Sequence, residues 1–142
     1  MKKVVLFILI LILVSCGASS TKTATTSSLY EVLTQQTDGG ASIRFFEILS
    51  EENEIAMLQN DEKLKGKIKS NDIQTSNFVV LNMGEKTSGG HEIGIGSVVE
   101  TDKNIIITIK ETSPESSSMV TQEITTPYCV LKINSKKEII IK

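Results

Sequence analysis

The chain has 142 residues, with 15 basic and 17 acidic side chains and a formal net charge of −2. This mildly acidic balance argues against a nucleic-acid partner, because nucleic-acid-binding domains carry a basic face. Tryptophan is absent and only 4% of the residues are aromatic, so isoleucine, valine and leucine must form the core of what the length predicts to be one domain.

The N-terminal segment 1–15 has the pattern of a signal peptide. Lys2 and Lys3 precede an apolar run from 4 to 14, and a small residue stands directly before Cys16. The run is too short to span a bilayer as a helix, which takes about 20 residues. The pattern is typical of bacterial lipoproteins, in which the cysteine is lipidated, and an ordinary signal peptide with an incidental cysteine is the alternative.

We therefore expect Cys16 to carry acyl chains such as palmitate and to anchor the protein to a membrane of the bacterial cell envelope. In a cell with two membranes, the outer membrane facing the periplasm is the expected site. Removal of residues 1–15 leaves 13 basic against 17 acidic side chains and a net charge of −4, which attracts no anionic lipid. Residues 16–28 are small and polar and predict a flexible tether to a single domain at 29–142.

The first part of the domain predicts mixed elements. Residues 29–34 are compatible with a short strand or a turn of helix, and 42–49 form a strand-length run rich in β-formers. Ser50 is the expected N-cap of a short helix from Glu51 to about Asn60, whose first turn is acidic. The charged run 61–71 is expected to be a solvated loop, with a partner-docking patch as the alternative.

The next residues predict a sheet. Residues 78–83 are apolar at nearly every position, which indicates a central strand buried on both faces. The strand that begins at His91 has Ile93 and Ile95 on one face and glycines on the other, which indicates either close packing over that face or a bulge. A hairpin turn at 101–104 then leads into another strand.

The C-terminal part predicts further strands. Residues 119–126 alternate in polarity and form a predicted strand that is either an edge strand or bent at the following proline. The strand 128–133 contains Cys129, which we expect to be a small core residue, and a turn leads to a last strand at 138–141. The whole predicts a small antiparallel β-sandwich or curled sheet with one short helix near the start of the domain.

The sequence lacks the residue patterns of known catalytic and metal-binding sites. His91 is the single histidine, and no serine lies in the strand-to-helix setting of a nucleophile. The loop that contains Lys86 lacks the glycines of a phosphate loop, and no cysteines and histidines have metal-site spacing. We expect neither an enzyme nor a bound metal or cofactor.

The loop from 84 to 91 is the candidate partner-binding element, because loops on a rigid β-scaffold often carry binding sites. The alternative is that its glycines only let the chain turn. The candidate residues are Gly84, Lys86, Thr87, Gly89, Gly90 and His91.

A family resemblance covers about residues 72–133. It rests on the order and spacing of several short motifs. These are an apolar run followed by Gly84-Glu85-Lys86, then Thr87, Gly89-Gly90 with Glu92-Ile93, Glu111-Thr112-Ser113-Pro114, and Thr121-Gln122 with Thr126-Pro127-Tyr128. With these motifs the segment resembles the C-terminal domain of the PrcB family, lipoprotein subunits named for a bacterial protease complex.

The resemblance implies a non-enzymatic accessory subunit that binds and stabilises a partner protein, such as a protease. Its motif positions include Pro114, Gln122, Pro127 and Tyr128. Where the family tends to have an aromatic residue after Gly-Gly, this chain has His91, and a cysteine follows Tyr128 where the family often has a polar residue. The alternative function is a small-molecule, peptide-binding or protease-inhibitor-like module that uses the 84–91 loop.

Overall fold

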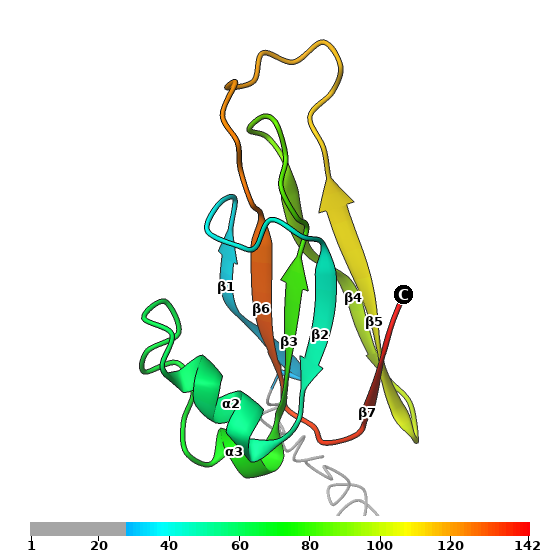
Figure 1. Cartoon of the computed structure of the whole chain (residues 1–142). Helices are drawn as coiled ribbons and strands as arrows, with labels where there is room; N and C mark the ends of the chain where they lie inside the picture. The colour runs from blue at the N-terminus through cyan, green and yellow to red at the C-terminus, as the bar shows by residue number, and fades with distance from the viewer. Residues whose placement is uncertain (1–27) are drawn as a thin grey trace, which may run out of the picture.

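The computed structural model describes residues 28–142, so the predicted signal peptide, Cys16 and all of the predicted tether but Ser28 lie outside the described residues. The described chain forms two β-sheets and two short helices, which confirms the mainly β prediction (Figure 1). Within residues 28–142, no helix has the length and apolar content needed to cross a membrane.

One sheet has four antiparallel strands in the order β1-β6-β3-β2. They are β1 (Tyr30–Gln36), β2 (Phe45–Leu49), β3 (Asn77–Asn82) and β6 (Tyr128–Ile133). All six residues of β6 and five of the six in β3 are buried, because both strands are covered on both faces. The near-continuous apolar run of β3 therefore correctly predicted a central strand.

The other sheet has three strands in the order β4-β5-β7. The antiparallel hairpin of β4 (Glu92–Glu100) and β5 (Asn104–Thr112) matches the prediction, but β7 (Glu138–Ile141) pairs parallel with β5. The expectation of an all-antiparallel fold is wrong at this point. Both edges of β6 are already occupied by β1 and β3, so the chain after β6 crosses to the second sheet instead of forming a hairpin.

The main core lies between the two sheets. Alternate residues of β3 and β6 face inward against β4, β5 and β7, as the two-residue period of strands requires. The buried members are Val79, Leu81, Met83, Ile93, Ile105, Ile107, Cys129, Leu131, Ile133 and Ile139. The expected core position of Cys129 is confirmed, and its burial raises the pKa of the thiol to about 11.

A second core covers the opposite face of the four-stranded sheet. It lies beneath helix α2 (Glu52–Gln59), helix α3 (Asp72–Thr75) and the segment between them. Leu64 and Ile68 of that segment are buried, so the charged run 61–71 is not simply a solvated loop: its two apolar residues anchor it to the sheet.

The predicted helix is present, but its N-cap is not the one expected. Glu51 takes the N-cap position instead of Ser50, and the backbone N–H groups of both residues donate to the Glu54 carboxylate at 3.1 and 3.0 Å. A glutamate at the third helical position can satisfy these donors directly. Helix α3 was not predicted, because it is only one turn long.

Candidate functional site

The 84–91 loop lies at the end of the sandwich opposite the helices, beside the long connection from 113 to 127 (Figure 1). The two segments are joined by backbone hydrogen bonds. Lys86 and Thr125 exchange N–H···O bonds of 2.8 and 2.9 Å, and Gly89 N–H donates to Thr121 O at 3.1 Å. The backbone amides of Lys86 and Gly89 are thus satisfied within the protein and are not free to bind a ligand.

The prediction of a strand at 119–126 is wrong. Its only ladder contact among the described residues is the bridge between Lys86 and Thr125. The alternating polarity is present, but the segment lies beside the irregular 84–91 loop, and the buried Pro127 follows it. A strand needs a regular neighbour, which this loop does not supply.

The glycines of the loop have packing roles. Gly84 has a φ of +78°, and a Cβ there would lie 2.9 Å from the backbone nitrogen of Arg44. Gly90 has a φ of +84° and packs against Pro114, where a Cβ would lie 3.1 Å from the ring. At Gly89 a Cβ would meet the Thr121 hydroxyl, so the exposed Thr121 side chain would have to move. These contacts give the turn interpretation direct physical support.

The polar candidates of the loop are divided between surface and interior. Thr87 is exposed, whereas Lys86 and His91 are half-buried. The His91 Nε2 atom lies 3.4 Å from Ser88 Oγ, while its Nδ1 atom is buried and has no hydrogen-bond partner among the described residues. A serine–histidine pair used for nucleophilic catalysis has a third group that orients the imidazole, and none contacts His91 in residues 28–142.

The family-motif positions also differ in whether they are buried or exposed. Pro127 and Tyr128 are buried, and Lys63 Nζ lies 5.1 Å from the centre of the Tyr128 ring. Pro114 is half-buried against Gly90, and Gln122 is exposed. Of these positions, only Gln122 is freely available to a partner.

A third segment, 38–44, completes this end of the molecule. Gly40 N–H donates to Thr126 O, and Glu85 N–H donates to Ser42 O, both at 2.9 Å. The buried side chain of Asn82 holds the segment from below by accepting from Ala41 N–H at 3.0 Å. We refer to residues 38–44, 84–91 and 113–127 together as the loop end.

Asp38 connects two segments of the loop end. Its carboxylate accepts hydrogen bonds from the Thr126 hydroxyl at 2.9 Å and from the Thr126 N–H at 3.1 Å. These bonds, with one from the Gly39 N–H, lower the pKa of Asp38, and the Thr126 hydroxyl is the largest cause. The Asp38 carboxylate therefore links the 38–44 segment to the 113–127 segment.

The loop end also exposes apolar side chains that the sequence prediction missed. Met119 is fully exposed, Ile43 is 72% exposed and Ile124 is 63% exposed. They come from two segments that are far apart in the sequence, and each stands in a stretch where no single motif marks it. Ile43 and Ile124 each stand between two polar neighbours, which is a signal that could have found them, whereas Met119 is followed by Val120 and carries no such signal.

Metal binding finds no support in the described chain. Within residues 28–142, no group of three or more histidine, cysteine, aspartate or glutamate side chains is placed to hold a metal ion.

Comparison with known families tests the predicted resemblance. Residues 77–134 match the family model described as PrcB C-terminal. The predicted resemblance is confirmed over this segment. The PrcB C-terminal segment spans β3, β4, β5 and β6 and so supplies the middle of the four-stranded sheet, the β4–β5 hairpin and two of the three loop-end segments. No curated protein and no solved structure was found to match the chain.

Proposed function

We propose that this domain is a non-enzymatic accessory subunit of the bacterial cell envelope that binds a partner protein through its loop end. The match to the PrcB C-terminal family supports a role in a protein complex, and a protease is the partner class that the family name suggests. The observation that carries the proposal is the exposure of Ile43, Met119 and Ile124 on segments tied together by hydrogen bonds.

The physical argument concerns preorganisation. Exposed apolar side chains gain free energy when a partner removes them from water. Backbone bonds at Lys86–Thr125 and Gly40–Thr126 already fix the segments that carry or support these side chains. Less conformational entropy is therefore lost on binding than for free loops.

The direction of β1 supports the loop end as the partner-binding surface. The strand begins at Tyr30 beside the helices and ends at Gln36 beside the loop end, and its seven residues span roughly 23 Å. The N-terminal segment therefore joins the domain at the end opposite the loop end. If Cys16 is lipidated, as we propose, the tether joins the domain away from the loop end and leaves the loop end free for a partner.

The alternative module, in which the 84–91 loop inserts into a protease cleft, fits less well. That loop is bonded along one side to the 121–125 segment, so it cannot enter a cleft alone. The exposed part of the loop end is the turn around 115–118, closed by a Ser118 N–H to Glu115 O bond of 2.9 Å, followed by Met119.

Site-specific photo-crosslinking in intact cells tests the proposal. A photoreactive amino acid at Met119 should give one discrete crosslinked product, and the same probe at Thr108, which is exposed on the outer face of β5, should give none. Mass spectrometry then identifies the attached protein. Equal products at both positions, or none at Met119, would contradict binding through the loop end.

Membrane fractionation tests the anchor separately. A Cys16→Ala variant should leave the membrane fraction. If it remains there, lipidation of Cys16 is not what anchors the protein.

A further inference from the structure

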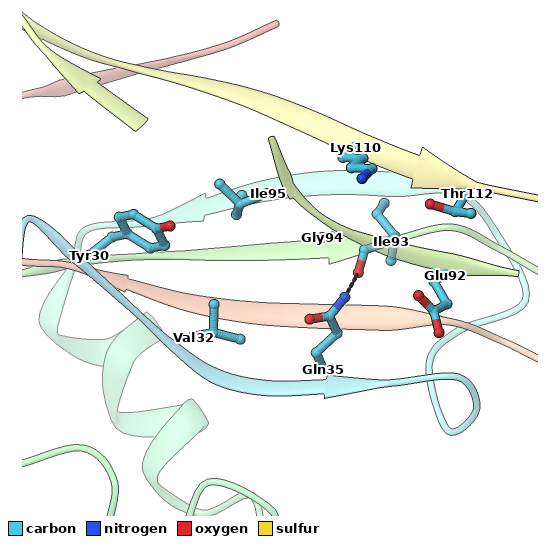
Figure 2. A pocket seen from close by; sticks show the side chains of 9 residues that line it. All are labelled: Tyr30, Val32, Gln35, Glu92, Ile93, Gly94, Ile95, Lys110 and Thr112. Carbon is cyan, nitrogen blue, oxygen red and sulfur yellow. Dashed lines mark hydrogen bonds between the residues drawn. The ribbon is translucent and has the colours of Figure 1, made fainter. Parts of the chain in front are cut away.

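The outer edge of β4 is open. Strand β4 lies at the edge of its sheet with β5 on one side, and within residues 28–142 no strand pairs with its other side. Strand β1 is likewise an edge strand of the four-stranded sheet, and Figure 2 shows the two edges running beside each other on one side of the sandwich. An unpaired edge presents backbone donors and acceptors that another strand can use.

A single side chain shows which way these groups point. The Gln35 side-chain amide, on β1, donates from Nε2 to the carbonyl oxygen of Ile93 at 3.0 Å (Figure 2). The Ile93 carbonyl therefore faces β1, away from β5. In an antiparallel strand the N–H of the same residue lies on the same side, and the groups of Ile95 follow after one two-residue period.

The Gln35 amide thus stands where a peptide group of a neighbouring strand would stand. It has the same donor and acceptor atoms as a backbone peptide unit. Unlike a strand, it is carried by a flexible exposed side chain and satisfies only the Ile93 carbonyl.

A groove surrounds this position. A cavity of about 230 Å³ opens between β1 and β4, with the backbone of Ile93 and Gly94 as its floor and Tyr30 and Val32 on the β1 side. A second hollow of about 220 Å³ adjoins it at Gln35 and Glu92. The two hollows share these residues and follow the edge of β4.

Gly94 keeps the floor of the groove bare. A Cβ at this position would lie 2.7 Å from Gln35 Nε2, the far end of a flexible side chain, and φ at Gly94 is not positive. A side chain at Gly94 is therefore compatible with the fold but would displace the amide and fill the groove. A glycine in a strand often marks close approach of another backbone.

We propose that an extended segment of a partner protein adds to the outer edge of β4 in this groove and displaces the Gln35 amide. Main-chain hydrogen bonds to Ile93 and Ile95 would supply the affinity, as in other cases of strand addition. Alternate side chains of the segment would face Tyr30 and Val32, which calls for apolar residues at those positions.

Selection of peptides on the purified full-length protein tests the inference. The probe is a displayed library of random linear peptides of about ten residues, the length of a long strand. Selected peptides should shift the amide resonances of Ile93 and Ile95 and slow hydrogen exchange of these two amides at least tenfold. The same peptides with N-methyl groups at alternate residues keep their side chains and should not bind.

Matched variants locate the site. Gly94→Val should weaken peptide binding at least tenfold, whereas Ser97→Val adds similar bulk to the same strand beyond the groove and should leave binding unchanged. Gln35→Ala removes the competing amide and should tighten binding a few-fold.

Three outcomes would overturn the inference: the library yields no binder, the N-methylated peptides bind equally well, or the shifts map to the loop end. None of them depends on whether Gly94→Val folds. The groove adjoins the loop end at Thr37 and Glu92, but the two sites have separate readouts: a photo-crosslink at Met119 for the loop end, and protection of the Ile93 and Ile95 amides for the groove.

Discussion

The four-stranded and three-stranded sheets differ in how many faces they bury. Strands β3 and β6 are covered on one face by the other sheet and on the other by the helical segment, so nearly all of their residues are buried. Strands β4 and β5 bury only the inward face, and outward residues such as Val99 and Thr108 are exposed. The first sheet therefore contributes to both cores, while the second sheet contributes to one core and has a face and an edge left for binding.

Substitution of Phe78 in the four-stranded sheet should have the largest effect on stability. Its side chain is fully buried in the core beneath the helices, so Phe78→Ala should lower the free energy of unfolding by about 3–5 kcal/mol. Thr108→Ala on the exposed face of β5 should change it by less than about 0.5 kcal/mol. Urea unfolding of both variants measures the difference, and a cost below about 1 kcal/mol for Phe78→Ala would show that the helical layer is not a true core.

Lys132 tests the polar part of the same buried face. Its Nζ atom lies 3.6 Å from the carboxylate of the buried Asp72 and 3.0 Å from the carboxylate of the exposed Glu31. Lys132→Met leaves a buried carboxylate without its cation and should cost about 3 kcal/mol. Glu31→Gln removes the exposed partner and should cost less than about 1 kcal/mol. Equal losses in thermal unfolding would contradict this assignment.

The stability that Asp38 contributes in the loop end should depend on pH in the acid range. Hydrogen bonds from Thr126 and Gly39 lower the pKa of Asp38 below its ordinary value of 3.8. The stabilisation is therefore fully present above that value and is lost as the pH falls through the lower folded-state pKa. The stability difference between the wild type and Asp38→Asn should be constant above pH 4 and should shrink below it. A difference that instead grows in acid would contradict the Asp38–Thr126 contact.

Cys129 should give the smallest effect under native conditions. Burial raises the pKa of its thiol to about 11 from 9.0, so the thiol is neutral and shielded at neutral pH. In a Cys16→Ala background, a thiol reagent should label Cys129 only as fast as the protein unfolds. Its contribution to stability is present below pH 9.0 and should be lost as the pH rises toward 11. Rapid labelling of the folded protein would contradict its core position.

Strands buried on both faces were the most predictable elements. The apolar run at 78–83 and the strand at 128–133 were placed correctly because covering both faces requires apolar residues at nearly every position. The two glycines in β4 predicted either close packing over that face or a bulge, and the structure shows both. Gln35 packs closely over Gly94, and the pairing register with β5 shifts between Ile95 and Ser97.

Elements that depend on distant neighbours were not predictable. The lysine-rich run 61–71 looked solvated because its two buried residues, Leu64 and Ile68, are outnumbered by charged ones. The parallel pairing of β7 has no local sequence signature. At the candidate site, the 84–91 loop was recognised, but the segments that hydrogen-bond to it, 38–44 and 113–127, are brought beside it only by tertiary structure.

The position of β6 between β1 and β3 has a consequence for how the chain folds. Tyr30 at the start of β1 pairs with Ile133 at the end of β6, so the first described strand waits for nearly the whole chain to be synthesised before its neighbour exists. Until then β3 has only β2 beside it, and both strands present open edges. A fold dominated by such distant pairings forms slowly, in about milliseconds to seconds, and its incomplete forms are prone to aggregation.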